Sequence, residues 1–89
     1  MVSRTTAGFR RQFGLLPREV QSQARAAFAV FKADPHHPRL HFKKLPPHED
    51  LWSARINRDY RVIGRWRGGV ILWFFIGSHA DYEAAIRRY

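Results

Sequence analysis

The sequence predicts an α+β fold in which an N-terminal strand and a helical hairpin pack on one face of a small antiparallel β-sheet, and a short helix ends the chain. An apolar stripe at helical spacing runs through residues 17–33. Strand-like apolar runs follow between residues 51 and 76, separated by short turns. At 89 residues the chain has the length of one small domain, so we expect a single domain over residues 1–89.

The N-terminal third is predicted to form a short edge strand and two helices. VSRTT, residues 2–6, has the length of an edge strand, and a first helix is expected from Gly8 to Leu15. It is interrupted before Pro17 because a residue that precedes proline disfavours the α region. Pro17 then begins a second helix that ends near residues 32–34. Its apolar stripe comprises Val20, Ala24, Ala27, Phe28 and Phe31.

The remainder of the chain is predicted to be a meander of strands. DPHHPR, residues 34–39, is a turn with two prolines, and Leu40–Leu45 alternates weakly as a strand would. After a loop over residues 46–50, three strands are expected in LWSARI, YRVIGRW and VILWFFI, at residues 51–56, 60–66 and 70–76. DYEAAIRR, residues 81–88, is the closing helix.

Short turns allow the pairing of these three strands to be predicted. The expected opposite pairs are Ala54 with Val62, Arg55 with Arg61, Trp66 with Ile71, Gly64 with Trp73, and Arg61 with Ile76. One face then carries Trp52, Ala54, Ile56, Tyr60, Val62, Trp66, Ile71, Trp73 and Phe75, which the two helices should cover. The other face carries Arg55, Arg61, Ile63, Arg65, Leu72 and Phe74, and its apolar members are expected to be exposed.

The composition favours a polyanionic partner. Sixteen Lys and Arg against seven Asp and Glu give a formal charge of +9, spread through segments with apolar periodicity rather than gathered in a tail. The chain has no cysteine, so neither a disulfide framework nor a thiolate zinc site is expected. It has no secretory pattern and no apolar run of about 18 residues, so we expect a cytoplasmic protein without a membrane partner.

Two features indicate an anion site with a proton donor beside it. Arg55 and Arg61 face each other across neighbouring strands without a carboxylate in the register, an arrangement that repels unless an anion binds there. In IGSHADYE, Ser78 and Asp81 suit the start of a helix, and His79 follows directly after the last strand. Imidazole titrates near neutral pH, so His79 is the best candidate for proton transfer.

Other basic residues extend this predicted surface. Lys43 and Lys44 alternate with an aromatic and an apolar residue in FKKL, as in surfaces where phosphates meet cations and bases stack on rings. Arg58 and Arg65 complete the expected RNA-binding set. His41 and His48 lie in or near the same segment.

The chemistry that remains available is that of Arg, Lys, His and Tyr. Paired catalytic carboxylates, a glycine-rich phosphate loop and a metal-binding cluster are all missing, so we expect neither a metal nor an organic cofactor. This inventory suits cleavage of RNA by attack of its own 2′-OH on the adjacent phosphate, because the substrate then supplies the nucleophile.

Four segments together resemble the RelE/ParE superfamily of bacterial toxins: FKKL, LWSARI, DYRVIG and WFFIGSHADYE. The resemblance implies the toxin of a type II toxin–antitoxin pair, most often an endoribonuclease that cuts mRNA in the ribosomal decoding site. The implied partners are a cognate antitoxin, with which the toxin forms a hetero-oligomer, and mRNA on the ribosome.

The resemblance also assigns roles to individual positions. It implies that Arg61 binds the phosphate, that Arg55 and Lys43 stand at further basic positions of the site, and that His79 is the proton donor. Tyr82 corresponds to a nearby aromatic. No acidic residue matches the general base of some members, and Glu49 is the nearest candidate.

Two alternatives remain open at the level of sequence. The same superfamily includes members that poison DNA gyrase, which would make this chain a protein-binding module. A non-catalytic RNA-binding or ribosome-binding protein would need the arginines but not His79.

Overall fold

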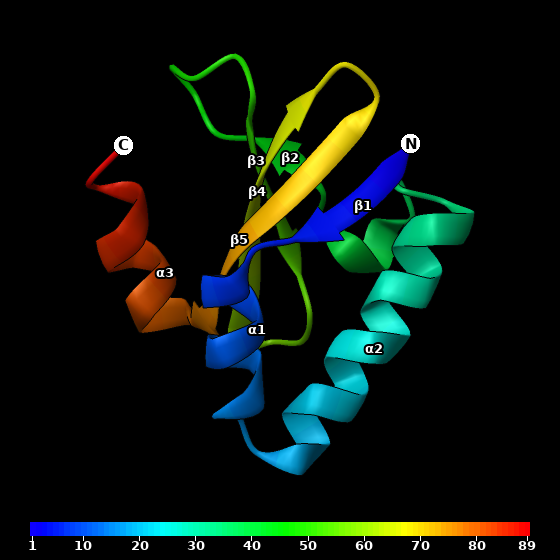
Figure 1. Ribbon diagram of the computed structural model, residues 1–89, viewed down its shortest axis with the longest axis vertical. Coiled ribbons are helices and arrows are strands. Elements are labelled where there is room, and N and C mark those ends of the chain that lie inside the picture. Colours follow the sequence, from blue (N-terminus) through cyan, green and yellow to red (C-terminus); the bar gives the residue numbers. More distant parts are fainter.

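The computed structural model describes residues 1–89 and has three α-helices and a five-stranded sheet in the order β1-β5-β4-β3-β2 (Figure 1). The elements are β1 (Val2–Thr5), α1 (Ala7–Gly14), α2 (Arg18–Ala33), the 3₁₀ helix η1 (Pro38–Leu40), β2 (Lys43–Lys44), β3 (Leu51–Arg55), β4 (Tyr60–Arg67), β5 (Val70–Ser78) and α3 (His79–Ile86). The predicted α+β class is confirmed. Because β1 pairs in parallel with β5 while the other strands are antiparallel, the sheet is mixed.

The N-terminal helices cover one face of the sheet, as predicted. Thr6 caps α1 by accepting a hydrogen bond from the backbone N–H of Phe9 at 3.0 Å. The apolar stripe of α2 faces inward, where Val20, Ala24, Ala27 and Phe31 are buried. The main core joins these helices to the sheet and comprises Phe9, Ala24, Ala27, Phe31, Leu40, Ala54, Ile56, Val62, Ile71, Trp73 and Ile76.

The opposite face of the sheet is partly covered by α3. A second core there contains Leu51, Ile63, Tyr82 and Ala85. The expectation that Ile63 is exposed is therefore wrong, because α3 folds back over it and leaves 0% of the residue accessible. Leu72, beyond this second core, is 39% exposed.

The predicted strand pairing is correct except at one end. Arg55 lies opposite Arg61, Trp66 opposite Ile71 and Gly64 opposite Trp73, but Arg61 pairs with Gly77 and not with Ile76. The register shifts between Ile63 and Gly64, where Ile63 pairs with Phe75 and leaves Phe74 as the extra residue of a β-bulge.

This bulge reverses the alternation of side chains in the last part of β5. Ile76 therefore joins the main core, whereas Phe75, predicted for that face, packs against the second core beneath α3. Gly64 lies at the shift, where an added Cβ would come within 2.8 Å of Trp73 Cε3. A glycine inside a strand pattern is the sequence feature that indicates such an irregularity.

The segment before the meander differs from its prediction as a strand over Leu40–Leu45. Only Lys43 and Lys44 pair with β3, because Leu40 ends η1 in the main core and His41 turns the chain in the left-handed region at φ 47°. No helix is long and apolar enough to span a membrane.

Candidate functional site

A cleft of about 240 Å³ opens beside α3, near the ends of β3 and β4. It brings together five of the eight predicted site residues, namely Lys43, Arg55, Arg61, His79 and Tyr82. The rest of its lining is formed by His41, Leu45, Ser53, Ala54, Glu83 and Ile86. Residues from β2, β3, β4 and α3 thus meet in one place.

Arg55 and Arg61 form the cationic centre of the cleft. They are directly opposite in the β3–β4 pair, and neither forms an ion pair with a carboxylate. Arg61 Nη1 donates to the backbone carbonyls of Asn57 at 2.7 Å and Tyr60 at 3.0 Å, so the turn fixes its guanidinium. Burial lowers the pKa of Arg61, and the positive charge of Arg55 lowers it further. A bound anion would relieve this repulsion.

His79 is held at the first turn of α3 by its backbone. Ser78 caps the helix, since its Oγ accepts from the N–H of Asp81 at 3.2 Å, which confirms the predicted cap. The N–H of His79 donates to the carbonyl of Asp59 at 2.7 Å and ties the start of α3 to the β3–β4 turn. The imidazole is 53% exposed, and its Nε2 lies 3.3 Å from Glu83 Oε1.

Tyr82 lies one turn further along α3, and its ring stacks on that of His79. The ring centroids are 5.9 Å apart with an interplanar angle of 27°. Its hydroxyl donates to Ser53 Oγ at 3.3 Å, and the residue is 5% exposed. In this structure, therefore, the ring contacts the proposed proton donor while the hydroxyl bonds β3.

Glu83 and Ser53 line the cleft but were not identified from the sequence. Glu83 follows His79 by four residues on a helix, a spacing that places two side chains on one surface and could have identified it. Ser53 is a buried residue of β3 whose role depends on the position of α3, which local sequence patterns do not reveal.

Three predicted RNA-binding residues lie outside the lining of the cleft. Lys44 points to the β2–β3 loop, where its Nζ is 3.6 Å from Glu49 Oε2. Glu49, the candidate general base, is correspondingly outside the cleft and 93% exposed in its side chain. Arg58 lines a neighbouring hollow.

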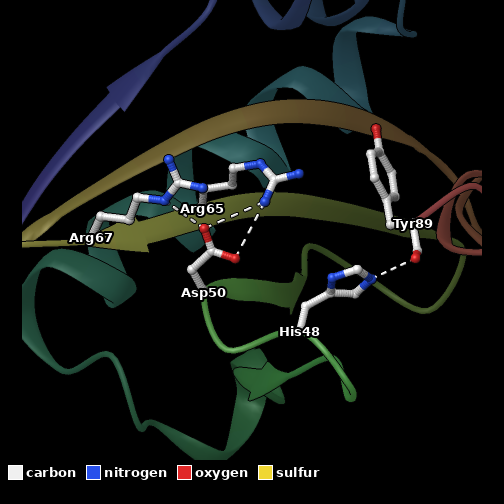
Figure 2. A network of polar contacts seen from close by, with 5 residues as sticks. All are labelled: His48, Asp50, Arg65, Arg67 and Tyr89. Carbon is white, nitrogen blue, oxygen red and sulfur yellow. Dashed lines mark hydrogen bonds and ion pairs between the residues drawn. The ribbon is translucent and has the colours of Figure 1, made fainter.

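Arg65 belongs to a separate polar network around Asp50 (Figure 2). Its Nη1 lies 3.3 Å from Asp50 Oδ1, while Arg67 Nε bonds Asp50 Oδ2 at 2.5 Å. The hydrogen bond from Arg67 has the largest effect and lowers the pKa of Asp50 below its ordinary value of 3.8. Desolvation opposes it, and the charges of Arg67 and Arg65 lower the pKa further. His48 Nε2 lies 2.6 Å from the carbonyl oxygen of Tyr89, which connects the same loop to the segment after α3.

The fold is shared with solved structures of small toxins. The RelE–RelB antitoxin–toxin complex from Methanococcus jannaschii matches over 92% of this chain and 96% of the other, at 11% identity and a TM-score of 0.75. The archaeal RelE–RelB complex from Pyrococcus horikoshii OT3 matches over 86% and 92%, at 21% identity and a TM-score of 0.69. The isolated RelE toxin of E. coli matches over 99% and 98%, at 16% identity and a TM-score of 0.68.

Sequence comparison places the chain within a family. Residues 18–84 match the family model of the ParE-like toxin domain. The chain therefore belongs to the ParE-like toxin family of the RelE/ParE superfamily. A search of curated proteins found no significant match.

Proposed function

We propose that this protein is the toxin of a type II toxin–antitoxin pair and that it acts as a ribosome-dependent endoribonuclease on mRNA. The observation that carries the proposal is the meeting of Arg55, Arg61 and His79 in one cleft, with the two guanidiniums free of ion pairs. Such a cleft provides phosphate binding and proton transfer, which is what cleavage by an internal nucleophile requires.

In the proposed reaction the ribose 2′-oxygen attacks the adjacent phosphorus, and the bond from phosphorus to the 5′-oxygen breaks. Arg61 and Arg55 bind the non-bridging oxygens and stabilise the charge that develops on them. His79 gives its proton to the departing 5′-oxygen, and a 2′,3′-cyclic phosphate remains. The proton of the 2′-OH leaves to a base, for which Glu83 and His41 are the candidates in the lining of the cleft.

We propose an antitoxin as the second partner. Its acidic or amphipathic segment would cover the basic cleft. Leu72, the most exposed member of the predicted second face, offers a further apolar contact on β5. The likeness to the two RelE toxins solved in complex with RelB supports this proposal.

Replacing His79 by alanine tests the nuclease. We expect His79→Ala to lower single-turnover cleavage on programmed ribosomes by about 10²–10⁴, the range of a lost general acid, with ribosome binding preserved. His36→Ala is the matched control, because His36 is an exposed histidine outside the cleft. Thermal unfolding of both variants shows whether the fold is intact, and cleavage by folded His79→Ala at the wild-type rate would contradict the proposal.

The match to a ParE-like family model favours gyrase inhibition as the second candidate. Induction of the protein would then leave translated mRNA intact, raise the DNA-damage response and trap purified gyrase on DNA. Primer extension on a translated message separates the two, because the nuclease produces new 5′ ends inside ribosome-covered reading frames. A non-catalytic RNA or ribosome binder would instead bind ribosomes without cutting mRNA or trapping gyrase.

A further inference from the structure

A second basic hollow lies beside the cleft and is lined by a different set of residues. Its volume is about 290 Å³, and its lining is Gln23, Arg39, Arg55, Ile56, Asn57 and Arg58. Three of these six side chains are arginines, and none is acidic. They come from β3, the β3–β4 turn, α2 and η1, so the tertiary fold brings them together.

The three guanidiniums of this hollow have no partner within the protein. Arg39, Arg55 and Arg58 form no ion pair and no side-chain hydrogen bond. Three unpaired like charges around one hollow repel one another, and nothing in its lining offsets that repulsion. The arrangement does not serve the fold, whereas a bound anion would neutralise it.

The amides of the hollow give it a fixed wall. Asn57 Nδ2 donates to Gln23 Oε1 at 2.5 Å and attaches the β3–β4 turn to α2. Asn57 Oδ1 accepts from the N–H groups of Asp59 at 2.8 Å and Tyr60 at 3.0 Å. The turn that carries Arg58 is therefore held in place, and little ordering remains for an anion to impose on its backbone.

Arg55 connects the hollow to the candidate site, because it lines both. Two anions bound in these places would therefore both adjoin Arg55. Successive phosphates of a single nucleic-acid strand would supply one anion to each place, and the planar fork of arginine suits phosphate oxygens.

We propose that this hollow, the Arg39–Arg58 subsite, binds a backbone phosphate that flanks the scissile one in single-stranded RNA. The proposal rests on the function proposed above and extends it from one phosphate to a track of phosphates. It assigns a role to Arg39, which no sequence pattern indicated, and a specific place to Arg58.

Binding of an uncleavable oligonucleotide tests the subsite without requiring cleavage. The probe is a short 2′-O-methyl RNA, in which the nucleophile is blocked, titrated against the protein over a series of NaCl concentrations. We expect Arg39→Ala and Arg58→Ala each to weaken binding. In each variant the negative slope of the logarithm of the association constant against the logarithm of the salt concentration should become less steep by about 0.7, the value for one phosphate contact on a single strand. For a 2′-O-methyl dinucleotide with one phosphate, we expect both variants to bind as the wild type does.

Arg4→Ala is the matched control, because this substitution removes the same charge at a different place. Arg4 is an exposed arginine without an ion pair on β1, at the opposite edge of the sheet from β2. This variant should leave the slope unchanged. Wild-type slopes in both subsite variants would overturn the proposal, as would failure of the wild-type protein to bind the oligonucleotide. The proposal would also be overturned if the two subsite variants bound RNA as the wild type does but bound an antitoxin peptide more weakly. That result would assign the hollow to an acidic protein. A subsite confirmed here in a protein that cuts no RNA would count against the nuclease alone.

Discussion

Tyr82 shows how one side chain can serve the fold and the site at once. Its hydroxyl bonds the buried Ser53 of β3, while its ring stacks on His79. The hydroxyl is thus engaged in a buried hydrogen bond, and only the ring of Tyr82 contacts the imidazole of His79. We infer that Tyr82 orients His79 and supports α3 through Ser53.

Tyr82→Phe separates these two contributions. It keeps the ring and leaves the Ser53 hydroxyl buried without its partner, so we expect the free energy of unfolding in urea to fall by about 1 kcal/mol. Single-turnover cleavage should fall much less than in Tyr82→Ala, which also loses the stacked ring. Tyr60→Phe is the control, because no hydrogen bond of the Tyr60 hydroxyl is present. Loss of cleavage in Tyr82→Phe equal to that in His79→Ala would show that the hydroxyl takes part in the chemistry.

At the scale of elements, Asp50 joins the β2–β3 loop to β4. Its carboxylate contacts Arg65 and Arg67, and its backbone carbonyl accepts from the N–H of Trp66 at 2.8 Å. Its pKa is lower in the folded protein than its ordinary value of 3.8. The ion pairs therefore contribute stability that is complete above the unfolded pKa and is lost as the pH falls through the folded pKa.

Asp50→Asn tests this contribution. We expect the variant to be less stable than the wild type at neutral pH, and the difference to shrink as the pH falls below about 3.8, because the unfolded wild-type chain then takes up a proton at Asp50 before the folded protein does. Urea unfolding across that pH range measures it. Asp59→Asn, at an exposed aspartate without an ion pair, should show a smaller difference. A stability difference in Asp50→Asn that does not change with pH would show that the charge of Asp50 contributes nothing.

The features that the sequence predicted correctly are those that depend on residues close together in the chain. The apolar stripe of α2, the Ser78 cap and the opposition of Arg55 and Arg61 across a short turn depend on neighbours in the chain. The bulge at Phe74 was missed because a strict alternation assumes that every residue pairs.

Long-range contacts account for the remaining differences between prediction and structure. The burial of Ile63 under α3 and the pairing of Arg65 with Asp50 join segments that are distant in sequence, so neither period nor turn length reveals them. For the same reason the sequence indicated the residues of the cleft better than those of the hollow, where Arg39 and Gln23 meet Arg58 only through the tertiary fold.

At the scale of the whole molecule, a charge of +9 makes association depend on ionic strength. Under the proposed function, the gene adjacent to this one encodes a small antitoxin with an acidic or amphipathic segment. We expect the two proteins to co-purify from an operon, and we expect added NaCl to slow their association more than it speeds dissociation. Stopped-flow mixing at several salt concentrations measures both rates. A protein that is abundant and harmless alone, and that no neighbour binds, would contradict this expectation.

The position of β5 between β1 and β4 makes completion of the sheet a late event during synthesis (Figure 1). β1 is made first, yet its only partner in the sheet is β5, which begins at Val70. Contacts between segments so distant in sequence form late, because the intervening chain must be available before they can close. His79 and Tyr82 follow β5, so a nascent chain contains Arg55 and Arg61 well before it contains the imidazole. A ribosome making this protein therefore carries an incomplete cleft until the last residues of α3 have emerged and packed on the sheet.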